Sequence, residues 1–158
     1  MKSLMLTAAA LTLSMSGIAI ADADGDAEAG EKVFKKCRAC HAIKNGDEVI
    51  QKGGKTGPNL YGVIGRVIGG EDFKYGSSLA SIAESEQVWD EEQLAIYVAN
   101  PSSWLKEITD DSGAKSKMTF KLKKGGEDVA AYLASVGPEM EDDDDDDSEE
   151  ESTESDDS

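Results

Sequence analysis

Two cysteines and one histidine fall within five consecutive residues, Cys37-Arg38-Ala39-Cys40-His41. Two cysteines three positions apart, followed at once by a histidine, form the attachment signature of c-type haem. The motif supplies two thiols for thioether bonds and one imidazole for the iron. We therefore predict one covalently bound haem c per chain, which means that the polypeptide has to fold around a large, flat and apolar group.

Other uses of these residues are limited by their number, because His41 is the only histidine and Cys37 and Cys40 are the only cysteines. A tetrahedral zinc site needs about four such ligands. A thioredoxin-like dithiol belongs at a strand-to-helix junction of alternating strands and helices, a pattern that this sequence lacks. A plain disulfide would leave the adjacent His41 as a coincidence. Haem attachment is the prediction, with the redox dithiol and the disulfide as alternatives.

The N-terminus has the features of an export signal. Lys2 precedes a mostly apolar run from Leu4 to Ile20, and Ala19-Ile20-Ala21 matches an A-x-A cleavage site. The run contains serine and threonine residues and is followed by acidic residues, so we do not expect this segment to be a permanent membrane anchor. We predict a signal peptide over residues 1–21, a mature chain from Asp22, and a periplasmic location, since bacteria attach c-type haem after export.

Methionine is scarce once the signal peptide is removed, because only Met118 and Met140 remain. Met140 stands at the head of an acidic tail, so a thioether ligand for the iron has to come from Met118. The single histidine excludes bis-histidine ligation. A histidine and methionine pair favours ferrous iron and raises the reduction potential. Taken alone, Met118 is equally suited to filling a gap in the core.

Charge divides the chain into two parts. Residues 139–158 hold fourteen acidic residues and no basic one, and we predict that this tail is disordered. Residues 22–138 hold 19 acidic and 15 basic residues and have the length of one domain. The formal net charge of −17 therefore describes the tail more than the folded surface. Nucleic acid is not expected as a partner of so acidic a chain.

Basic residues gather near both expected iron ligands. Lys35, Lys36 and Arg38 flank the cysteines, while Met118 is surrounded by Lys115, Lys117, Lys121, Lys123 and Lys124. If His41 and Met118 bind opposite sides of one iron, these lysines form a ring around the exposed haem edge and steer it to acidic partners. The alternative is that they are ordinary solvated lysines.

A second hypothesis concerns the acidic tail, which would fold back onto the lysine ring and compete with acidic partners. The alternative is that the tail is a solubilising extension.

Helical spacing and capping residues predict an all-α protein of about five short helices. The best marked begins at Asp90, where Gln93 completes a capping-box variant and Trp89 and Leu94 fit a hydrophobic staple. The glycine-rich stretch from Ala42 to Gly76 is predicted to be a long loop that wraps a ligand. The expected helices run, in chain order, from Asp26 to about Lys36, from Ser78 through Ala83, from Asp90 to Asn100, from Pro101 through Leu105 and from about Glu127 to Val136.

The aliphatic and aromatic residues of these helices are few for a core that stands alone. A covalently held macrocycle would supply the missing apolar volume. We therefore predict that the haem-free chain is poorly folded, as small metallodomains are without their metal.

Several motifs occur in an order that resembles class I, mitochondrial-type cytochrome c. They are Gly30 to Phe34, the haem motif, Lys55 to Leu60, Gly65-Arg66, Phe73-Lys74-Tyr75, Trp89 with Tyr97, Asn100-Pro101 and Lys117 to Phe120. The resemblance covers Gly25 to Pro138 and implies the class I cytochrome c fold, with long loops wrapped around one haem. The run from Gly113 to Leu122 is especially similar to soluble periplasmic cytochromes c of denitrifying and purple photosynthetic bacteria. The longer segment before the methionine and the acidic tail depart from the mitochondrial pattern.

The resemblance implies a role for each matching residue. Cys37 and Cys40 would hold the haem, and His41 and Met118 would be the axial ligands. The carbonyl of Pro58 would accept a hydrogen bond from His41. The inner haem propionate would be bound by Arg66, Tyr75 and Trp89, and Tyr97 would lie close to Met118. Gly30 and Phe34 would meet Tyr132 and Leu133 where the first and last helices cross.

The function implied is transport of single electrons in the periplasm between membrane-bound complexes. The donor would be a cytochrome bc1-type complex, and the acceptor a terminal oxidase, a photosynthetic reaction centre or a denitrification reductase. With both axial positions filled the chain is expected to be a carrier and not an enzyme, and it is expected to be a monomer. The alternatives are a small haem peroxidase or ligand-binding haem protein in which Met118 is displaced, and a thiol oxidoreductase.

Overall fold

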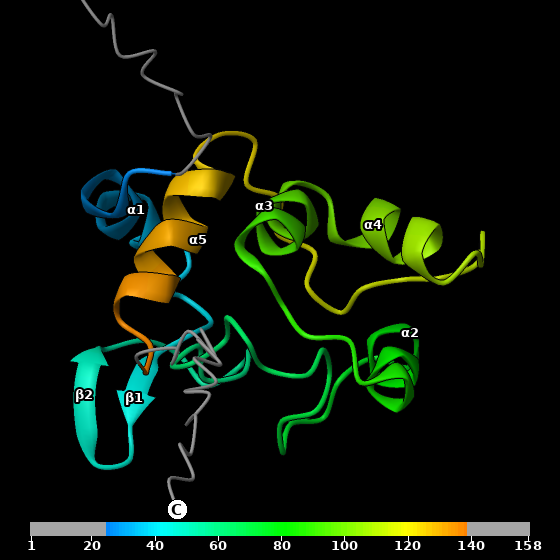
Figure 1. Cartoon of the computed structure of the whole chain (residues 1–158), viewed down its shortest axis with the longest axis horizontal. Coiled ribbons are helices and arrows are strands. Elements are labelled where there is room, and N and C mark those ends of the chain that lie inside the picture. Colours follow the sequence, from blue (N-terminus) through cyan, green and yellow to red (C-terminus); the bar gives the residue numbers. More distant parts are fainter. Residues whose placement is uncertain (1–24, 139–158) are drawn as a thin grey trace, which may run out of the picture.

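A computed structural model describes residues 25–138 of the chain. The expected signal peptide and the expected acidic tail lie outside the described residues. Helices and loops make up nearly all of this part, so the predicted all-α class is confirmed (Figure 1). Its elements are α1 (Ala27–Phe34), β1 (Ile43–Asn45), β2 (Glu48–Gln51), α2 (Ser77–Ala80), the 3₁₀ helix η1 (Ser81–Ser85), α3 (Glu91–Ala99), α4 (Pro101–Ile108) and α5 (Gly126–Ser135).

The first and last helices cross in close contact, with α1 behind α5 in Figure 1. Asp26 caps α1, since its Oδ1 accepts hydrogen bonds from the backbone N–H groups of Glu28 and Ala29 at 2.8 and 3.1 Å. Gly30 is buried at the crossing, where an added Cβ would lie 1.9 Å from the carbonyl oxygen of Asp128. The contact therefore requires glycine, as expected from the sequence.

Two further helices follow the predicted signals. Asp90 caps α3 through its Oδ1, which accepts from the N–H of Gln93 at 2.6 Å. The Gln93 side chain donates from Nε2 to the Asp90 carboxylate at 3.0 Å, and its Oε1 accepts no hydrogen bond from the backbone N–H of Asp90, so only half of the expected capping box forms. Pro101 begins α4 at the first helical position, where a missing N–H costs nothing.

The segment from Ala42 to Gly76 differs from the predicted loop at its start. The strands β1 and β2 form an antiparallel hairpin there, and Ile43 is fully buried. The hairpin turns at Gly46, whose φ of 56° lies in the left-handed region that favours glycine. From Lys52 to Gly76 the chain has no helix or strand, as predicted. The first helix also ends earlier than predicted, at Phe34 instead of near Lys36, so the cysteines follow it in a turn.

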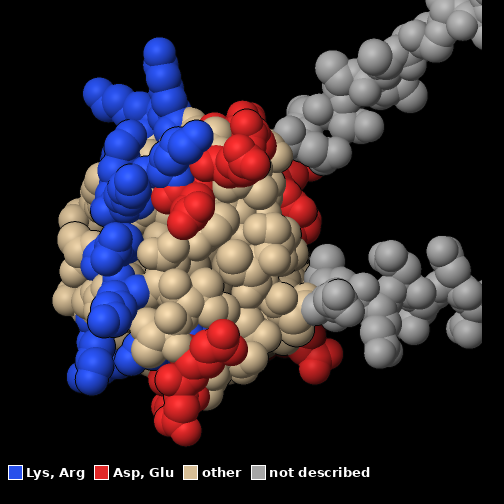
Figure 2. Space-filling view, turned by 90° about the vertical axis from the view of Figure 1, so that its left-hand side faces the viewer, with Lys and Arg blue, Asp and Glu red and all other residues tan. Residues whose placement is uncertain are grey.

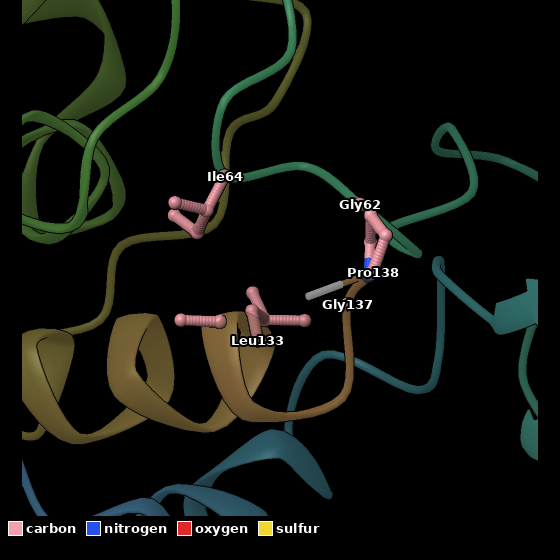
Figure 3. Close-up of a pocket in the computed structure, with 6 residues that line it drawn as sticks. Gly62, Ile64, Leu133, Gly137 and Pro138 are labelled. Carbon is pink, nitrogen blue, oxygen red and sulfur yellow. The ribbon is translucent and has the colours of Figure 1, made fainter. Parts of the chain in front are cut away.

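The C-terminal end of the described chain packs against the long loop. Pro138 lies beside Gly62, and Ile64 and Leu133 lie on either side of a small hollow of about 20 Å³ there (Figure 3). This contact joins the end of α5 to the long loop. Within residues 25–138 no helix has both the length and the apolar character that crossing a membrane requires.

Candidate haem site

The residues predicted from the sequence to form the haem site line one large cavity. It has a volume of about 500 Å³ and lies between the cysteine motif, the long loop, α3 and the segment before α5. Every expected site residue lines it: Cys37, Cys40, His41, Pro58, Arg66, Tyr75, Trp89, Tyr97 and Met118. Residues up to 81 positions apart in the sequence are thus brought to one space.

The imidazole of His41 is fixed in orientation by the loop. Its Nδ1 lies 2.8 Å from the carbonyl oxygen of Pro58. A carbonyl oxygen only accepts hydrogen bonds, so Nδ1 carries the proton and Nε2 keeps its lone pair. Burial lowers the pKa of His41, and the hydrogen bond to Pro58 opposes this in part. The ring is therefore kept in the neutral form that binds a metal ion.

Three glycines let the loop approach the cysteine motif closely. An added Cβ on Gly53 would lie 1.7 Å from the carbonyl oxygen of His41, and one on Gly54 would lie 2.3 Å from that of Ala39. At Gly57 an added Cβ would lie 2.3 Å from Cε1 of the His41 ring. In the sequence Gly57 stood out only as a member of the motif from Lys55 to Leu60. The structure gives it a further role, because the loop lies directly on the imidazole.

Cys37 and Cys40 both line the cavity, and no disulfide bond joins them. Cys37 is half-buried and Cys40 is exposed. Burial raises the pKa of Cys37 to about 11, while Lys36 lowers it and Cys40 raises it. A reactive dithiol depends on a lowered pKa, so this environment does not suit a thiol oxidoreductase.

Met118 lies half-buried in a segment that hydrogen bonds attach to several helices. The hydroxyl of Ser116 lies 3.1 Å from the Tyr97 hydroxyl and accepts from the N–H of Met118 at 3.0 Å. The N–H of Ser116 itself donates to Ser102 of α4 at 3.2 Å. Ser116 therefore links the Tyr97 hydroxyl to the backbone of Met118. The sequence had not indicated a role for Ser116.

The aromatic candidates have partners of their own. Trp89 packs against Tyr97 and Trp104 with ring centroids 5.0 and 5.1 Å apart, and all three are buried. Burial raises the pKa of Tyr75, which Arg66 lowers and Glu71 raises. Arg66 donates from Nη2 to the carbonyl oxygen of Asn59 at 2.9 Å and pairs with Glu71. Arg66, Tyr75 and Trp89 all line the cavity, so its wall includes side chains that are able to donate hydrogen bonds to a carboxylate.

Basic side chains lie around the cavity. Lys36 lines it from the cysteine motif, Lys115 and Lys117 from the methionine segment and Lys74 from the long loop. The Nζ of Lys117 donates to the carbonyl oxygen of Lys74 at 2.9 Å, which joins two of these segments. Figure 2 shows basic side chains gathered in a band along one side of the molecule. Lys74 had not been expected in this group.

The donor set fits a c-type haem. Two thiols, a neutral imidazole with a free Nε2 and a thioether face one mostly apolar space within an all-α fold. The described residues contain no group of three or more His, Cys, Asp or Glu side chains arranged to hold a metal ion by themselves. Fold and site together define a class I c-type cytochrome.

Comparison with known proteins agrees with this class. No family model matched the chain. Cytochrome c-551 of Roseobacter denitrificans is 55% identical over 111 residues, which cover 69% of this chain and 79% of the relative. Cytochrome c2 of Rhodobacter capsulatus is 55% identical over 113 residues, or 70% and 82% of the two chains. Cytochrome c-550 of Paracoccus denitrificans is 48% identical over 142 residues, or 87% and 89%.

Solved structures give the same result. Cytochrome c2 from Rhodobacter capsulatus superposes with a TM-score of 0.69 at 56% identity, over 71% of this chain and 98% of the other. Cytochrome c2 from Paracoccus denitrificans gives a TM-score of 0.70 at 54% identity, over 73% and 98%. The chain belongs to the family of bacterial cytochromes c2 and c-550, which are electron carriers and not enzymes. Its cofactor is one covalently held haem c.

Proposed function

We propose that this cytochrome carries single electrons in the periplasm between membrane-bound redox complexes, with His41 and Met118 as the axial ligands of the iron. The observation that supports this most is the cavity, which is lined by both His41, whose Nδ1 is bonded to Pro58, and Met118. When bound, the haem supplies a one-electron couple between ferrous and ferric iron. The predicted signal peptide and the family together support a periplasmic location.

The protein's own residues would hold both ligands ready without having to move. Pro58 keeps the His41 ring in one tautomer, and Gly57 allows the loop to cover the ring. Ser116 links the Met118 backbone to Tyr97 and, through Ser102, to α4. A site fixed in this way changes little between oxidation states, which is what fast electron exchange needs. Filled axial positions also leave no place for a substrate.

Spectroelectrochemical titration of the exported protein tests the ligand assignment. We expect a positive midpoint potential together with the weak red absorption band that reports sulfur bound to ferric iron. In Met118→Leu, which has a similar volume, we expect that band to disappear, the midpoint to fall and carbon monoxide to bind the reduced protein. A wild-type protein that lacks the band and binds carbon monoxide readily would instead support the peroxidase or ligand-binding alternative.

Docking would use the lysines at the cavity. Lys36, Lys74, Lys115 and Lys117 would meet an acidic surface on a cytochrome bc1-type donor and on an oxidase, reaction centre or denitrification reductase as acceptor. Long-range attraction of this kind acts mainly on the association rate and weakens with salt. We expect Lys36→Gln to slow oxidation by such a complex at low ionic strength. The control is Lys106→Gln on α4, which does not line the cavity and should leave the rate unchanged.

A further inference from the structure

Glu71 is an acidic residue beside the haem cavity to which the site described above gives no function. It follows two glycines in the irregular part of the long loop, and its side chain is 26% exposed. The Oε2 atom is buried and lies 2.6 Å from Nη1 of Arg66. The Arg66 side chain is itself only 20% exposed, so most of this ion pair is shielded from water.

Arg66 is held at the cavity wall by more than its ion pair. Nη2 donates to the carbonyl oxygen of Asn59 at 2.9 Å, and Nη1 donates to that of Tyr61 at 3.4 Å. A guanidinium has five N–H groups in a rigid plane, so donors remain for a second anion. A haem propionate in the cavity and the Glu71 carboxylate would therefore share one cation.

The same contacts connect the ion pair to the His41 side of the site. The Asn59 side chain exchanges two hydrogen bonds with the backbone of Lys44, at 2.9 and 2.8 Å. The residue before it, Pro58, provides the carbonyl that His41 contacts. Arg66 and the imidazole are thus attached to consecutive residues of one turn. A guanidinium whose counter-ion is removed is consequently still held near the haem by the turn.

Glu71 and Arg66 have opposite electrostatic effects on their surroundings. Both act on the phenol of Tyr75, where Arg66 lowers the pKa and Glu71 raises it, in addition to the larger effect of burial. Ferric iron carries one more positive charge than ferrous iron, so a nearby cation favours the reduced state and a nearby anion the oxidised state. Partly buried charges are also screened less by salt than exposed ones.

We propose that Glu71 is the counter-ion of Arg66 and lowers the reduction potential by cancelling much of the positive charge that Arg66 presents to the haem. This inference rests on the proposed function, in which a haem iron between His41 and Met118 takes up one electron. Glu71 is a positioning and tuning residue in this account, since it acts through Arg66.

The first test compares two variants that remove one negative charge at adjacent positions. Asp72 is exposed, so Asp72→Asn is the matched control for Glu71→Gln. We expect Glu71→Gln to shift the midpoint potential to more positive values by at least about twice the Asp72→Asn shift at low ionic strength. At high ionic strength the Asp72→Asn shift should shrink and the Glu71→Gln shift should persist. Equal shifts for the two variants at both salt concentrations would overturn the proposal.

A second test does not depend on the folding of Glu71→Gln, which leaves a half-buried cation without a partner. Arg66→Gln alone should shift the midpoint to more negative values. The double variant Arg66→Gln/Glu71→Gln keeps the net charge of the pair, so its midpoint should return toward that of the wild type. A double variant with the same midpoint as Arg66→Gln would mean that Glu71 does not act on the haem. A purely structural role would change thermal stability but not this pattern of potentials.

The wild-type spectrum separates failure of this inference from failure of the proposed function. Absence of the red sulfur-to-iron band in the wild type would refute the ligand assignment on which both depend. A wild type with the band, combined with indistinguishable midpoints for Glu71→Gln and Asp72→Asn, would refute the role of Glu71 alone.

Discussion

The crossing of α1 with α5 and the cover of the haem motif by the long loop both require glycine, but they join different kinds of structure. At Gly30 an added Cβ would meet the carbonyl of Asp128 at 1.9 Å, and at Gly57 it would meet the His41 ring at 2.3 Å. The first contact is between two helices with buried side chains, such as Phe34 and Tyr132, whose ring centroids are 5.7 Å apart. The second is between a side chain and a loop without regular structure.

The two regions therefore have different roles, since the helix crossing stabilises the fold and the loop positions the iron ligands. Helix α1 is fixed by its cap, its packing on α5 and a hydrogen bond from the N–H of Asp26 to Asp128 at 3.0 Å. The loop is attached to the cysteine motif by single backbone hydrogen bonds, as from Gly54 to Arg38 and from Gly57 to Cys40, both 2.9 Å long. We infer that damage to the crossing destabilises the whole fold, and damage to the loop acts first on the iron ligands.

The largest effect is expected when the covalent haem is removed altogether. In Cys37→Ala/Cys40→Ala the loop loses the group it encloses, while the α1–α5 contact is made by protein alone. We expect loss of cooperative melting, on the order of 5 kcal/mol of stability or more, with part of the helical circular dichroism retained. Cys40→Ala, which keeps one thioether bond, should be intermediate. A haem-free chain that melts cooperatively at the wild-type temperature would contradict the comparison.

Next in size is Gly30→Ala. The added methyl group has to separate two helix backbones, because the atom it meets is a carbonyl oxygen and not a flexible side chain. We expect a loss of about 3 kcal/mol in the free energy of unfolding by guanidinium, with the visible spectrum nearly unchanged. In Gly113→Ala the new Cβ meets only the end of the Asp111 side chain, at 3.1 Å, so this control should change little.

Gly57→Ala should show the reverse pattern. Gly57 lies in a loop without helix or strand, so we expect the loop to shift from His41 at a smaller loss of stability, about 1 to 2 kcal/mol. The hydrogen bond to Pro58 would lengthen, and the ligand field and midpoint potential would change. Visible spectra and redox titration measured on the same samples check this. A variant with a normal spectrum but a loss as large as that of Gly30→Ala would remove the distinction between the two regions.

A smaller effect is expected at the helix cap. Asp26→Ala removes the acceptor for two backbone N–H groups at the start of α1. The expected loss is about 1 kcal/mol, measured by chemical unfolding. Asp26→Asn keeps an acceptor oxygen and should recover most of it. The reduction potential should not change in either variant, because the cap is outside the cavity.

Truncation after Pro138 is expected to have the smallest effect on stability, close to zero. It removes fourteen acidic residues and no basic one. If the tail competes with partners for the lysines, truncation should speed oxidation by a membrane complex at low ionic strength and make no difference at high ionic strength. Identical salt profiles with and without residues 139–158 would leave the tail as a solubilising extension.

Much of the helical structure was predictable because the signals are local. Asp26 and Asp90 are side-chain caps of the helices that they predict, and Pro101 begins α4. The hairpin of β1 and β2 was missed although Gly46-Asp47 is a typical hairpin turn, because strands of three and four residues show no clear alternation. The tertiary contact that stabilises it, between Asn59 and Lys44, spans fifteen positions.

The sequence predicted the residues expected to bind the haem and its iron, but not the side chains that hold the neighbouring residues in position. The spacing of Cys37, Cys40 and His41 is set by haem chemistry and is readable in any fold. The pairing of Glu71 with Arg66 depends on the path of an irregular loop, for which no periodic pattern exists. Ser116 joins residues from three separate segments, and only the folded chain brings these together.

The band of basic side chains along one side of the molecule (Figure 2) has a practical consequence for attaching the protein to electrodes. The basic band lies on one side, and the described chain begins and ends on the side away from it. A conducting surface coated with carboxylates would attract the lysine side and would repel the acidic C-terminal sequence. Adsorbed molecules would then share one orientation, with the cavity nearest the conductor. A fusion partner added at the C-terminus would then lie on the side away from the conductor and leave the adsorbed basic side uncovered.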